Sequence, residues 1–406
     1  MTLWEKVRSW FFPPQPLAQE MVHYQTPPDA ADQYRLHLRV ERDGRGLLVV
    51  NAATVLHLNQ TAAEYARLLV QGLDEDAVVR AITDRYSIGP AQVRADYRQL
   101  RDQIITLATT TDVAPDYFLD TDQVKPFSAT TAAPYRVDIA LTYRMDESGT
   151  LDPEARRRVD RELSTAEWQQ ALRRLWDAGI PHVVFTGGEP TLRDDLAELV
   201  RYAEGLGQVT GLLTDGRRLR EMAYLDGLLQ AGLDHLQITL ISHVAGVHDG
   251  VVGQAGAWEQ TMAGLRNALA ADIYVVVGLV IRAENAAAVV ETVRSLAEMG
   301  VRAVALSSPL RAGSEEERGR LQAALQAAQE AAHAGNVTLI WDLAAPYSRV
   351  HPIELEAGLS SEQIARQHLY LEPDGDALPA QGYNIVLGNI LRHRWATIWE
   401  NPARRI

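Results

Sequence analysis

The chain has 406 residues, 47% of them hydrophobic and 23% charged, as in globular proteins large enough for two or three domains. Its formal net charge of −14 at pH 7 disfavours nonspecific binding to nucleic acid or to an anionic membrane. It contains no cysteine, which excludes disulfide bonds, thiolate nucleophiles, cysteine-ligated zinc and all-cysteine iron–sulfur clusters.

An aromatic and basic segment, Trp4–Phe12, opens the chain and is broken by Pro13-Pro14. It lacks the apolar stretch and cleavage site of a signal peptide, so we expect residues 1–33 to form an N-terminal arm. The longest apolar run, Ile273–Ile281, has the length of a strand and is shorter than the roughly 18 residues of a membrane span. We therefore expect no membrane span and a cytoplasmic protein.

Residues 34–106 predict a small α+β domain of the winged-helix type. A hairpin with a glycine turn and one further strand come first: Tyr34–Val40, Leu47–Val50 and Val55–Leu58. Three helices with apolar residues at three- and four-residue spacing follow: Ala62–Gln71, Asp74–Tyr86 and Pro90–Ile105. Thr61 and Glu64 have the spacing of a capping box at the start of the first helix.

The segment Leu47–Tyr86 resembles the PqqD-like peptide-recognition domain found beside enzymes that mature ribosomal peptides. The resemblance is carried by a strand running into Asn51, by Leu58-Asn59, by an apolar helix, and by Asp74-Glu75, Ile82 and Tyr86. It implies that the edge of the hairpin at residues 34–50 binds a leader or substrate peptide as an added strand. A purely structural or DNA-binding winged helix is the alternative, and the negative charge disfavours nucleic acid.

A linker rich in Thr, Asp, Ala and Pro is expected over residues 107–133. Strands then alternate with helices. The strands are Val137–Leu141, His182–Phe185, Val209–Leu213, His235–Leu240, Tyr274–Ile281 and Ala303–Ser307. The helices are Thr165–Trp176, Asp195–Glu204, Arg220–Ala231, Ala257–Ala270, Ala286–Met299 and Ser314–Ala332. This order predicts the α/β class, with a parallel sheet curled into a partial (β/α)6 barrel over residues 134–335.

Polar residues follow the predicted strands at the end where α/β proteins bind ligands. They are Thr186, Glu189, Thr214, Asp215, Thr239, Ser242 and Ser307. Gly187-Gly188 would let the backbone approach a ligand closely, and the carboxylate of Glu189 could pair with a small cationic group. Taken alone, each of these residues is better explained as a helix cap or a turn residue.

Several ordered motifs resemble the radical S-adenosylmethionine (radical SAM) superfamily, in the subgroup with a SPASM or twitch-like C-terminal extension, here residues 336–406. The motifs are Phe185–Leu192, Leu213–Gly216, Leu236–Ser242, His248–Gly253, Asn285, Leu371–Pro379, Leu387–Ile390 and Ile398-Trp399. The resemblance covers about Pro134 to Pro402. It implies contacts to S-adenosylmethionine from Gly187, Gly188, Glu189, Pro190, Thr214, Asp215, Thr239 and Ser242.

The chain departs from this family where the family binds its [4Fe–4S] cluster. After Leu141–Arg144 the family has three cysteines, and this chain has Met145, Gly149 and Asp152 at those positions. Ala380 likewise stands where related sequences often carry a cysteine for an auxiliary cluster. A thioether, a glycine and one carboxylate do not hold such a cluster, so we expect none and leave the catalytic residues unassigned. Without a cluster, no electron reaches S-adenosylmethionine to generate a radical.

Two further constellations have alternative interpretations. His248-Asp249 is either a general base with its orienting carboxylate or, as we favour, a pair that fixes a loop. The group Trp341–Leu343, Pro346–Ser348, Glu354 and Glu356 either lines a site under the extension or forms a solvated loop.

Three functional hypotheses follow. The first is a cluster-less, noncatalytic relative of radical SAM proteins that binds a peptide beside a maturation-enzyme partner. S-adenosylmethionine or another nucleotide is a second candidate ligand in this hypothesis. The second is an enzyme that uses Glu189, Asp215 or His248 for non-radical chemistry. The third, and most remote, is a radical SAM enzyme whose cluster ligands come from a partner.

Overall fold

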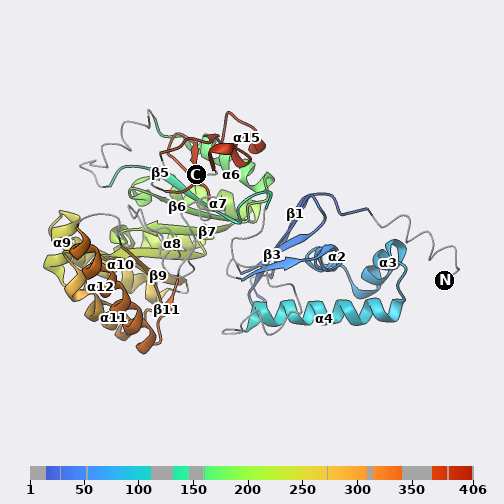
Figure 1. The fold of residues 1–406 in the computed structure, drawn as a ribbon, viewed down its shortest axis with the longest axis horizontal. Coiled ribbons are helices and arrows are strands. Elements are labelled where there is room, and N and C mark those ends of the chain that lie inside the picture. Colours follow the sequence, from blue (N-terminus) through green and yellow to red (C-terminus); the bar gives the residue numbers. More distant parts are fainter. Residues whose placement is uncertain are drawn as a thin grey trace. The chain divides into compact units, whose positions relative to one another are not determined.

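The computed structural model describes residues 15–27, 29–51, 54–110, 131–145, 159, 161–271, 273–308, 314–340, 368–381 and 384–404. The predicted arm segment Trp4–Phe12 and the group from Trp341 to Glu356 lie outside these residues. The chain forms two compact units, Met1–Tyr135 and Arg136–Ile406 (Figure 1). Among the described helices, none combines the length and the apolar character needed to cross a bilayer.

The N-terminal unit is an antiparallel sheet packed against helices. Its strands, in sheet order, are β1 (Glu20–Gln25), β2 (Arg35–Val40), β3 (Gly46–Val50) and β4 (Thr54–Leu58). Its helices are α2 (Gln60–Val70), α3 (Glu75–Arg85) and α4 (Pro90–Thr109). The alternating strand β2 and the continuous apolar run of β3 bury Leu38 and Leu48 completely, and Ile104 of α4 joins the same core. The predicted α+β arrangement of strands followed by three helices is confirmed.

The predicted boundary between an arm and this domain at residue 34 is wrong. Strand β1 lies within the predicted arm and pairs with β2 over six residues, from Glu20 opposite Val40 to Gln25 opposite Arg35. The N–H of Thr26 also donates to the carbonyl of Tyr34 at 3.1 Å and closes the connection. The strand has mostly half-buried side chains and a weak alternation, so its pairing with β2 specifies it more than its own sequence does.

The hairpin at residues 34–50 therefore lacks the free edge on which the peptide-binding prediction relied. Strand β2 pairs with β1 on one side and with β3 on the other, and β3 pairs with β2 and β4. Their backbone groups on both sides are used by the ladder. Among the described strands of this sheet, the outer edges belong to β1 and β4.

The first helix is capped by Asn59, whereas the sequence pattern predicted Thr61. The Oδ1 atom of Asn59 accepts a hydrogen bond from the N–H of Ala62 at 2.9 Å. Glu64, the expected partner in a capping box, is buried and instead accepts from the hydroxyl of Tyr86 at 2.7 Å. The hydrogen bond to Tyr86 therefore takes the place of the capping-box contact predicted for Glu64.

The second unit is a curved sheet flanked by helices (Figure 1). Six parallel strands form its centre: β5 (Arg136–Thr142), β6 (His182–Gly187), β7 (Val209–Thr214), β8 (His235–Leu240), β9 (Tyr274–Val280) and β10 (Ala303–Ser307). The helices are α6 (Thr165–Asp177), α7 (Leu196–Leu206), α8 (Met222–Gln230), α9 (Ala245–Val252), α10 (Ala257–Ala270), α11 (Val289–Glu298) and α12 (Glu315–Ala334). The sheet order from β10 to β5 is sequential, as the predicted partial barrel requires. Helix α9 falls in a segment expected to be a loop.

The described part of the predicted extension joins the same sheet at both edges. Strand β11 (Thr338–Leu339) pairs in parallel with β10, and β12 (Tyr370–Leu371) pairs in parallel with β5. Antiparallel strands β13 (Asp376–Leu378) and β14 (Gly388–Asn389) continue outward from β12, and the short helix α15 (Trp395–Trp399) follows. The described residues after 335 thus extend the barrel sheet and belong to one compact unit with it.

Candidate functional site

The turn after β6 brings two backbone segments into contact. Gly187 has φ +134°, and a Cβ there would lie 2.1 Å from the carbonyl oxygen of Thr142. A Cβ at Gly188 would lie 2.2 Å from the carbonyl oxygen of Arg144. The N–H of Gly188 donates to Thr142 at 2.8 Å, and the N–H of Glu189 donates to Arg144 at 2.6 Å. The space where side chains at these two positions would begin is occupied by backbone carbonyl groups at the end of β5 and just after it.

The carboxylate of Glu189 is buried and accepts four hydrogen bonds within the protein. Its Oε1 accepts from the N–H of Thr191 at 2.9 Å, from the Thr191 hydroxyl at 2.5 Å and from the Thr214 hydroxyl at 2.8 Å. Its Oε2 accepts from the N–H of Asp215 at 2.8 Å. A carboxylate has about four acceptor positions. All four positions are therefore used by hydrogen bonds that join the turn after β6 to the end of β7.

Burial also changes the protonation of this group. It raises the pKa of Glu189 to about 8, and the negative charge of Asp215 adds to the rise. The hydrogen bonds from Asp215 and Thr191 act in the opposite direction and are outweighed. Because four internal donors already occupy its acceptor positions, the carboxylate has no position left for the ammonium of an amino acid. The ammonium contact that the family resemblance implies for Glu189 is therefore not prepared in this structure.

Asp215 is paired with a neighbouring arginine. Its Oδ1 accepts from the N–H of Arg217 at 2.9 Å, and its Oδ2 accepts from the Nε of Arg217 at 2.6 Å. The same guanidinium donates to the side chain of Gln254 and, at 3.3 Å, to the carbonyl of Met145. The extra charge of Asp215, which stands where the family pattern has Asn, is therefore balanced locally. Arg217 in turn reaches the first of the positions where the family has a cluster cysteine.

The hydrogen bonds of Glu189 do not include the remaining predicted residues. Pro190 is the first residue of a short 3-10 turn, Pro190–Leu192. Thr239 lies near the end of β8, and Ser242 follows that strand and accepts at its Oγ from the N–H of Val244 at 3.1 Å. The hydrogen bonds join Glu189, Thr214 and Asp215 into one cluster, while the bond to Ser242 fixes the start of α9.

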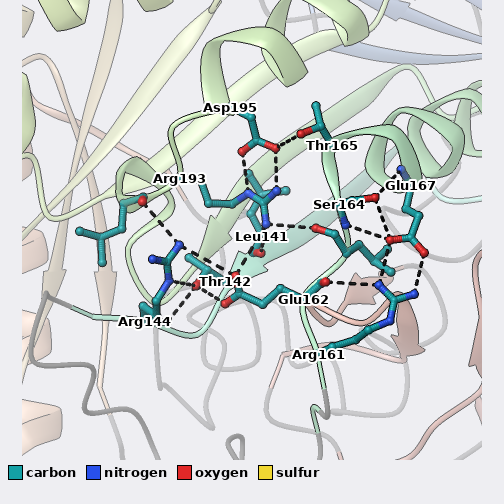
Figure 2. A network of polar contacts seen from close by, with 12 residues as sticks. Leu141, Thr142, Arg144, Arg161, Glu162, Ser164, Thr165, Glu167, Arg193 and Asp195 are labelled. Atoms are coloured by element: carbon teal, nitrogen blue, oxygen red, sulfur yellow. Dashed lines mark hydrogen bonds and ion pairs between the residues drawn. The ribbon is translucent and has the colours of Figure 1, made fainter.

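The end of β5 is held by a network of arginines and carboxylates that the sequence analysis did not identify (Figure 2). Arg193 is buried and forms a two-point ion pair with Asp195, with N–O distances of 2.6 and 2.8 Å. It also donates to the carbonyls of Leu163 at 3.2 Å and Leu141 at 3.4 Å. The Thr142 hydroxyl donates to Glu162. The sequence offered one indication of this ion pair: Arg193 and Asp195 are two positions apart, and residues with that spacing can meet within one turn.

His248 and Asp249 fix loops, as favoured from the sequence. The Nδ1 atom of His248, which is buried, accepts from the N–H of Ile241 at 3.3 Å. The carboxylate of Asp249 accepts from the N–H groups of Gly256 and Trp258, each at 2.7 Å. Both side chains therefore hold backbone next to α9, and neither contacts the Glu189 cluster through these bonds.

The inner face of the sheet carries buried polar atoms without a hydrogen-bond partner in the described part of the chain. They include the Thr186 hydroxyl, the Ser307 hydroxyl and both amide atoms of Gln237. These residues come from β6, β10 and β8, and Gln237 is 1% exposed. The sequence analysis named Thr186 and Ser307 but missed Gln237, whose only signal is a polar residue inside the apolar run Leu236–Ile238.

An iron–sulfur cluster does not fit the residues of this chain. The sequence contains no cysteine, and the described residues hold no group of three or more His, Cys, Asp or Glu side chains that could bind a metal ion. Met145 lies after β5, whereas Gly149 and Asp152 fall outside the described residues.

Glu189 offers no contact to the amino-acid end of S-adenosylmethionine. That end would need a free carboxylate or an open iron, and Glu189 is already saturated. The polar atoms of Thr186, Gln237 and Ser307 that lack a partner are neutral, as the nucleoside end is, but they are fully buried.

Part of this unit is similar to a known protein family. Residues 142–307 match the family model described as the radical SAM superfamily. The PqqA peptide cyclase of Rhizobium meliloti is 38% identical over 112 residues, 28% of this chain and 30% of that protein. The enzyme of the same name from Methylobacterium nodulans is 27% identical over 256 residues, 60% of this chain and 66% of that protein. The chain thus spans less than two thirds of either relative.

Among solved structures, Streptococcus suis SuiB bound to S-adenosylmethionine is similar to this chain with a TM-score of 0.58 and 14% identity. The alignment covers 94% of this chain and 88% of that chain, so it includes residues of both units. The structure of SuiB bound to its precursor peptide SuiA gives a TM-score of 0.59 and 14% identity, over 96% of this chain and 89% of that chain. At this identity the likeness shows the fold, and the radical SAM α/β fold predicted from the sequence is confirmed.

Gly188→Ala should lower the free energy of unfolding by roughly 2–4 kcal/mol, because the new Cβ would lie 2.2 Å from the backbone carbonyl oxygen of Arg144. Gly205→Ala in α7 is the matched control, since nothing lies within 4 Å of its Cβ position. Alanine should stabilise that helical site by up to about 1 kcal/mol. Urea unfolding of both variants measures the difference, and equal effects would contradict the close contact.

We expect a pH-dependent difference between the free energies of unfolding of the wild type and Glu189→Gln. The free energy of the wild type, minus that of the variant, should fall by at least about 1 kcal/mol as pH rises from 4.5 to 8. The folded-state pKa of Glu189 lies above its ordinary value, so protonation favours the folded state. The resulting stabilisation is complete below pH 4.5 and is lost as pH approaches 8. Urea unfolding at several pH values measures it. If the wild type instead became more stable relative to Glu189→Gln as pH rises, the four donors would keep the carboxylate charged in the folded protein.

Proposed function

We propose that this chain is a cluster-less radical SAM-like protein that binds a peptide as a noncatalytic component of peptide maturation. One observation carries the proposal: the radical SAM α/β fold is present in a chain with no cysteine. A cluster-dependent reaction needs thiolate ligands that this chain does not supply.

The contacts of the barrel agree with a noncatalytic role. In the relatives' chemistry an electron from the cluster cleaves S-adenosylmethionine, and no residue of this chain replaces that electron source. The side chains that a non-radical reaction would use are also engaged. Glu189 is saturated by four donors, Asp215 is paired with Arg217, and His248 accepts from a backbone N–H. These contacts favour the noncatalytic hypothesis over the enzymatic alternative.

A peptide is the ligand class that the comparisons support. The curated relatives are named as cyclases of the PqqA peptide, and one SuiB structure contains a precursor peptide. The N-terminal unit, which resembles PqqD-like domains, offers a sheet on which a peptide could add as a further strand. Since β2 and β3 are interior, the peptide would have to add at the outer edge of β1 or β4. A maturation enzyme that supplies the chemistry is the partner this role requires.

Retention of a nucleoside ligand is part of the proposal. The neutral polar atoms on the inner face of the sheet suit the adenosine part of S-adenosylmethionine, whereas the amino-acid part has lost its expected contact at Glu189. The residues after 335 would act as a SPASM or twitch-like extension without cluster ligands, since Ala380 stands at the expected cysteine position.

Anaerobic reconstitution with iron and sulfide should leave the protein without a cluster, because the chain lacks thiolates. Iron analysis should give far less than one atom per chain, and incubation with dithionite and S-adenosylmethionine should yield no 5′-deoxyadenosine. A cysteine-ligated radical SAM enzyme treated in parallel is the positive control. About four irons per chain together with cleavage of S-adenosylmethionine would overturn the noncatalytic role.

Peptide binding should slow amide hydrogen exchange at an outer edge of the N-terminal sheet. Suitable probes are the PqqA and SuiA peptides and a leader-like peptide encoded near this chain. We expect saturable binding of at least one probe with new protection in Thr54–Leu58 or Glu20–Gln25, because these are the outermost of the described strands and an added strand pairs with an outer edge. The interior strands β2 and β3 serve as the internal control. Saturable binding with protection confined to the barrel would contradict strand addition, and no binding would remove the peptide role.

A further inference from the structure

Strand β1 is held less firmly than the two strands beside it in the N-terminal sheet. None of its six side chains is buried, whereas five of six are buried in β2 and all five in β3. The buried members of the core under this sheet come from β2, β3, β4, α2 and α4, and β1 adds only the partly buried Val22 and Tyr24. The core of the described unit is therefore complete without β1. Strands with so little buried surface are the ones that open locally.

The polar contacts of β1 lie at the surface. Its Glu20 forms an ion pair with Arg67 of α2, and about a third of each side chain stays exposed, 32% for Glu20 and 29% for Arg67. Its His23 is exposed and stacks on His37 of β2 with ring centroids 6.1 Å apart. Ion pairs exposed in this way stabilise a fold only slightly. Strand β1 is thus attached mainly by its backbone pairing and by its two partly buried apolar side chains.

The backbone N–H groups of β1 face alternately toward β2 and away from it. In an antiparallel pair, every second residue exchanges hydrogen bonds with the residue opposite it. The bond from the N–H of Thr26 to the carbonyl of Tyr34 at 3.1 Å fixes this alternation. Counting back along the register, the N–H groups of Val22 and Tyr24 face β2. The N–H of Gln25 faces away from it.

The same alternation divides the N–H groups of β2 between its two neighbours. The N–H of Asn51 donates to the carbonyl of Arg35 at 3.0 Å, so the N–H of His37 also faces β3. The N–H groups of Leu36 and Leu38 face β1. If β1 left the sheet, the backbone groups of these two leucines would lose their partners, and another extended strand could take them up.

We propose that β1 is a removable strap, an autoinhibitory strand that closes the edge of β2 until a peptide strand replaces it. The inference rests on the proposed function, in that a peptide is the ligand, and it adds how access is regulated. While β1 is in place, a peptide adds only at an outer edge of the sheet. The side of β1 over the core carries Glu20, Val22 and Tyr24, and Glu20 reaches Arg67. A replacing strand therefore needs an acidic, an apolar and an aromatic residue at alternate positions.

Amide hydrogen exchange of the ligand-free, full-length wild type tests the release of β1 without any variant. The N–H groups of Val22, Tyr24, Leu36 and Leu38 should be protected at least about tenfold less than that of His37. Opening of β1 exposes those four together and leaves the pairing of β2 with β3 intact. His37 is the internal control, since it lies between the two leucines on the same strand. Equal protection of all five would mean that β1 opens only with the whole sheet and would overturn the proposal.

A synthetic, fluorescently labelled peptide with the sequence of residues 18–27 is the probe for strand exchange. Full-length Val22→Pro should bind it with a dissociation constant at least about tenfold lower than the wild type does, because proline removes an N–H that faces β2 and loosens the competing strand. Gln25→Pro is the matched control and should bind like the wild type, because the N–H that it removes faces away from β2. A probe carrying Val22→Ser and Tyr24→Ser should bind none of the three proteins. Fluorescence anisotropy measures all of these affinities.

Three results of the binding experiment would overturn the proposal. Equal affinity of the wild type and Val22→Pro would mean that the probe adds at an outer edge and leaves β1 in place. No saturable binding by a folded Val22→Pro would mean that the edge of β2 stays closed. Loss of exchange protection throughout β2 and β3 in Val22→Pro would make β1 an integral part of the fold.

Failure of the strap is distinguishable from failure of the proposed function. The exchange measurement on the wild type uses no peptide, so a strand that does not open refutes the strap whether or not the PqqA, SuiA or leader-like peptides bind. If β1 opens and exchanges with the probe but none of those peptides binds, the strap is supported and the proposed role in peptide maturation is refuted.

Discussion

The saturated carboxylate of Glu189 is the interaction on which the rest of the site depends. Four donors from Thr191, Thr214 and Asp215 surround it, and they come from the turn after β6 and from the end of β7. Because these donors fix two neighbouring strand ends to each other, the backbone around them has a defined shape without a bound metal or ligand. A group buried for this purpose has little capacity left for a ligand.

Much of the barrel could be predicted because its pattern is regular. Strands β8 and β10 and helix α10 have the bounds expected from alternation and helical spacing. Residues at the strand ends could likewise be named, since parallel strands end at one edge of a sheet. Their partners could not be predicted. Glu189 and the N–H of Asp215 are 26 positions apart, and which oxygen meets which donor is decided by the fold.

The N-terminal unit shows a different limit of sequence reasoning. Alternation identified β2 and β3 correctly as a hairpin, but whether a strand lies at an edge depends on what pairs beside it. Strand β1 belongs to a segment of weak alternation, and it covers the side of β2 that the hairpin alone would expose. Gln237 was missed for a related reason. The sequence shows only a glutamine between apolar residues. That its amide is buried without a partner among the described residues becomes visible only in the folded structure.

Arg217 has a consequence for how this lineage can change. Its guanidinium pairs with Asp215 and donates to the backbone of Met145, the first of the positions where the family has a cluster cysteine. Replacing Asp215 alone would leave that guanidinium without its carboxylate, and replacing Arg217 alone would leave the carboxylate of Asp215 without its cation and remove the contact to Met145. The ion pair thus couples the two positions, so a substitution at one is expected to be accompanied by a substitution at the other.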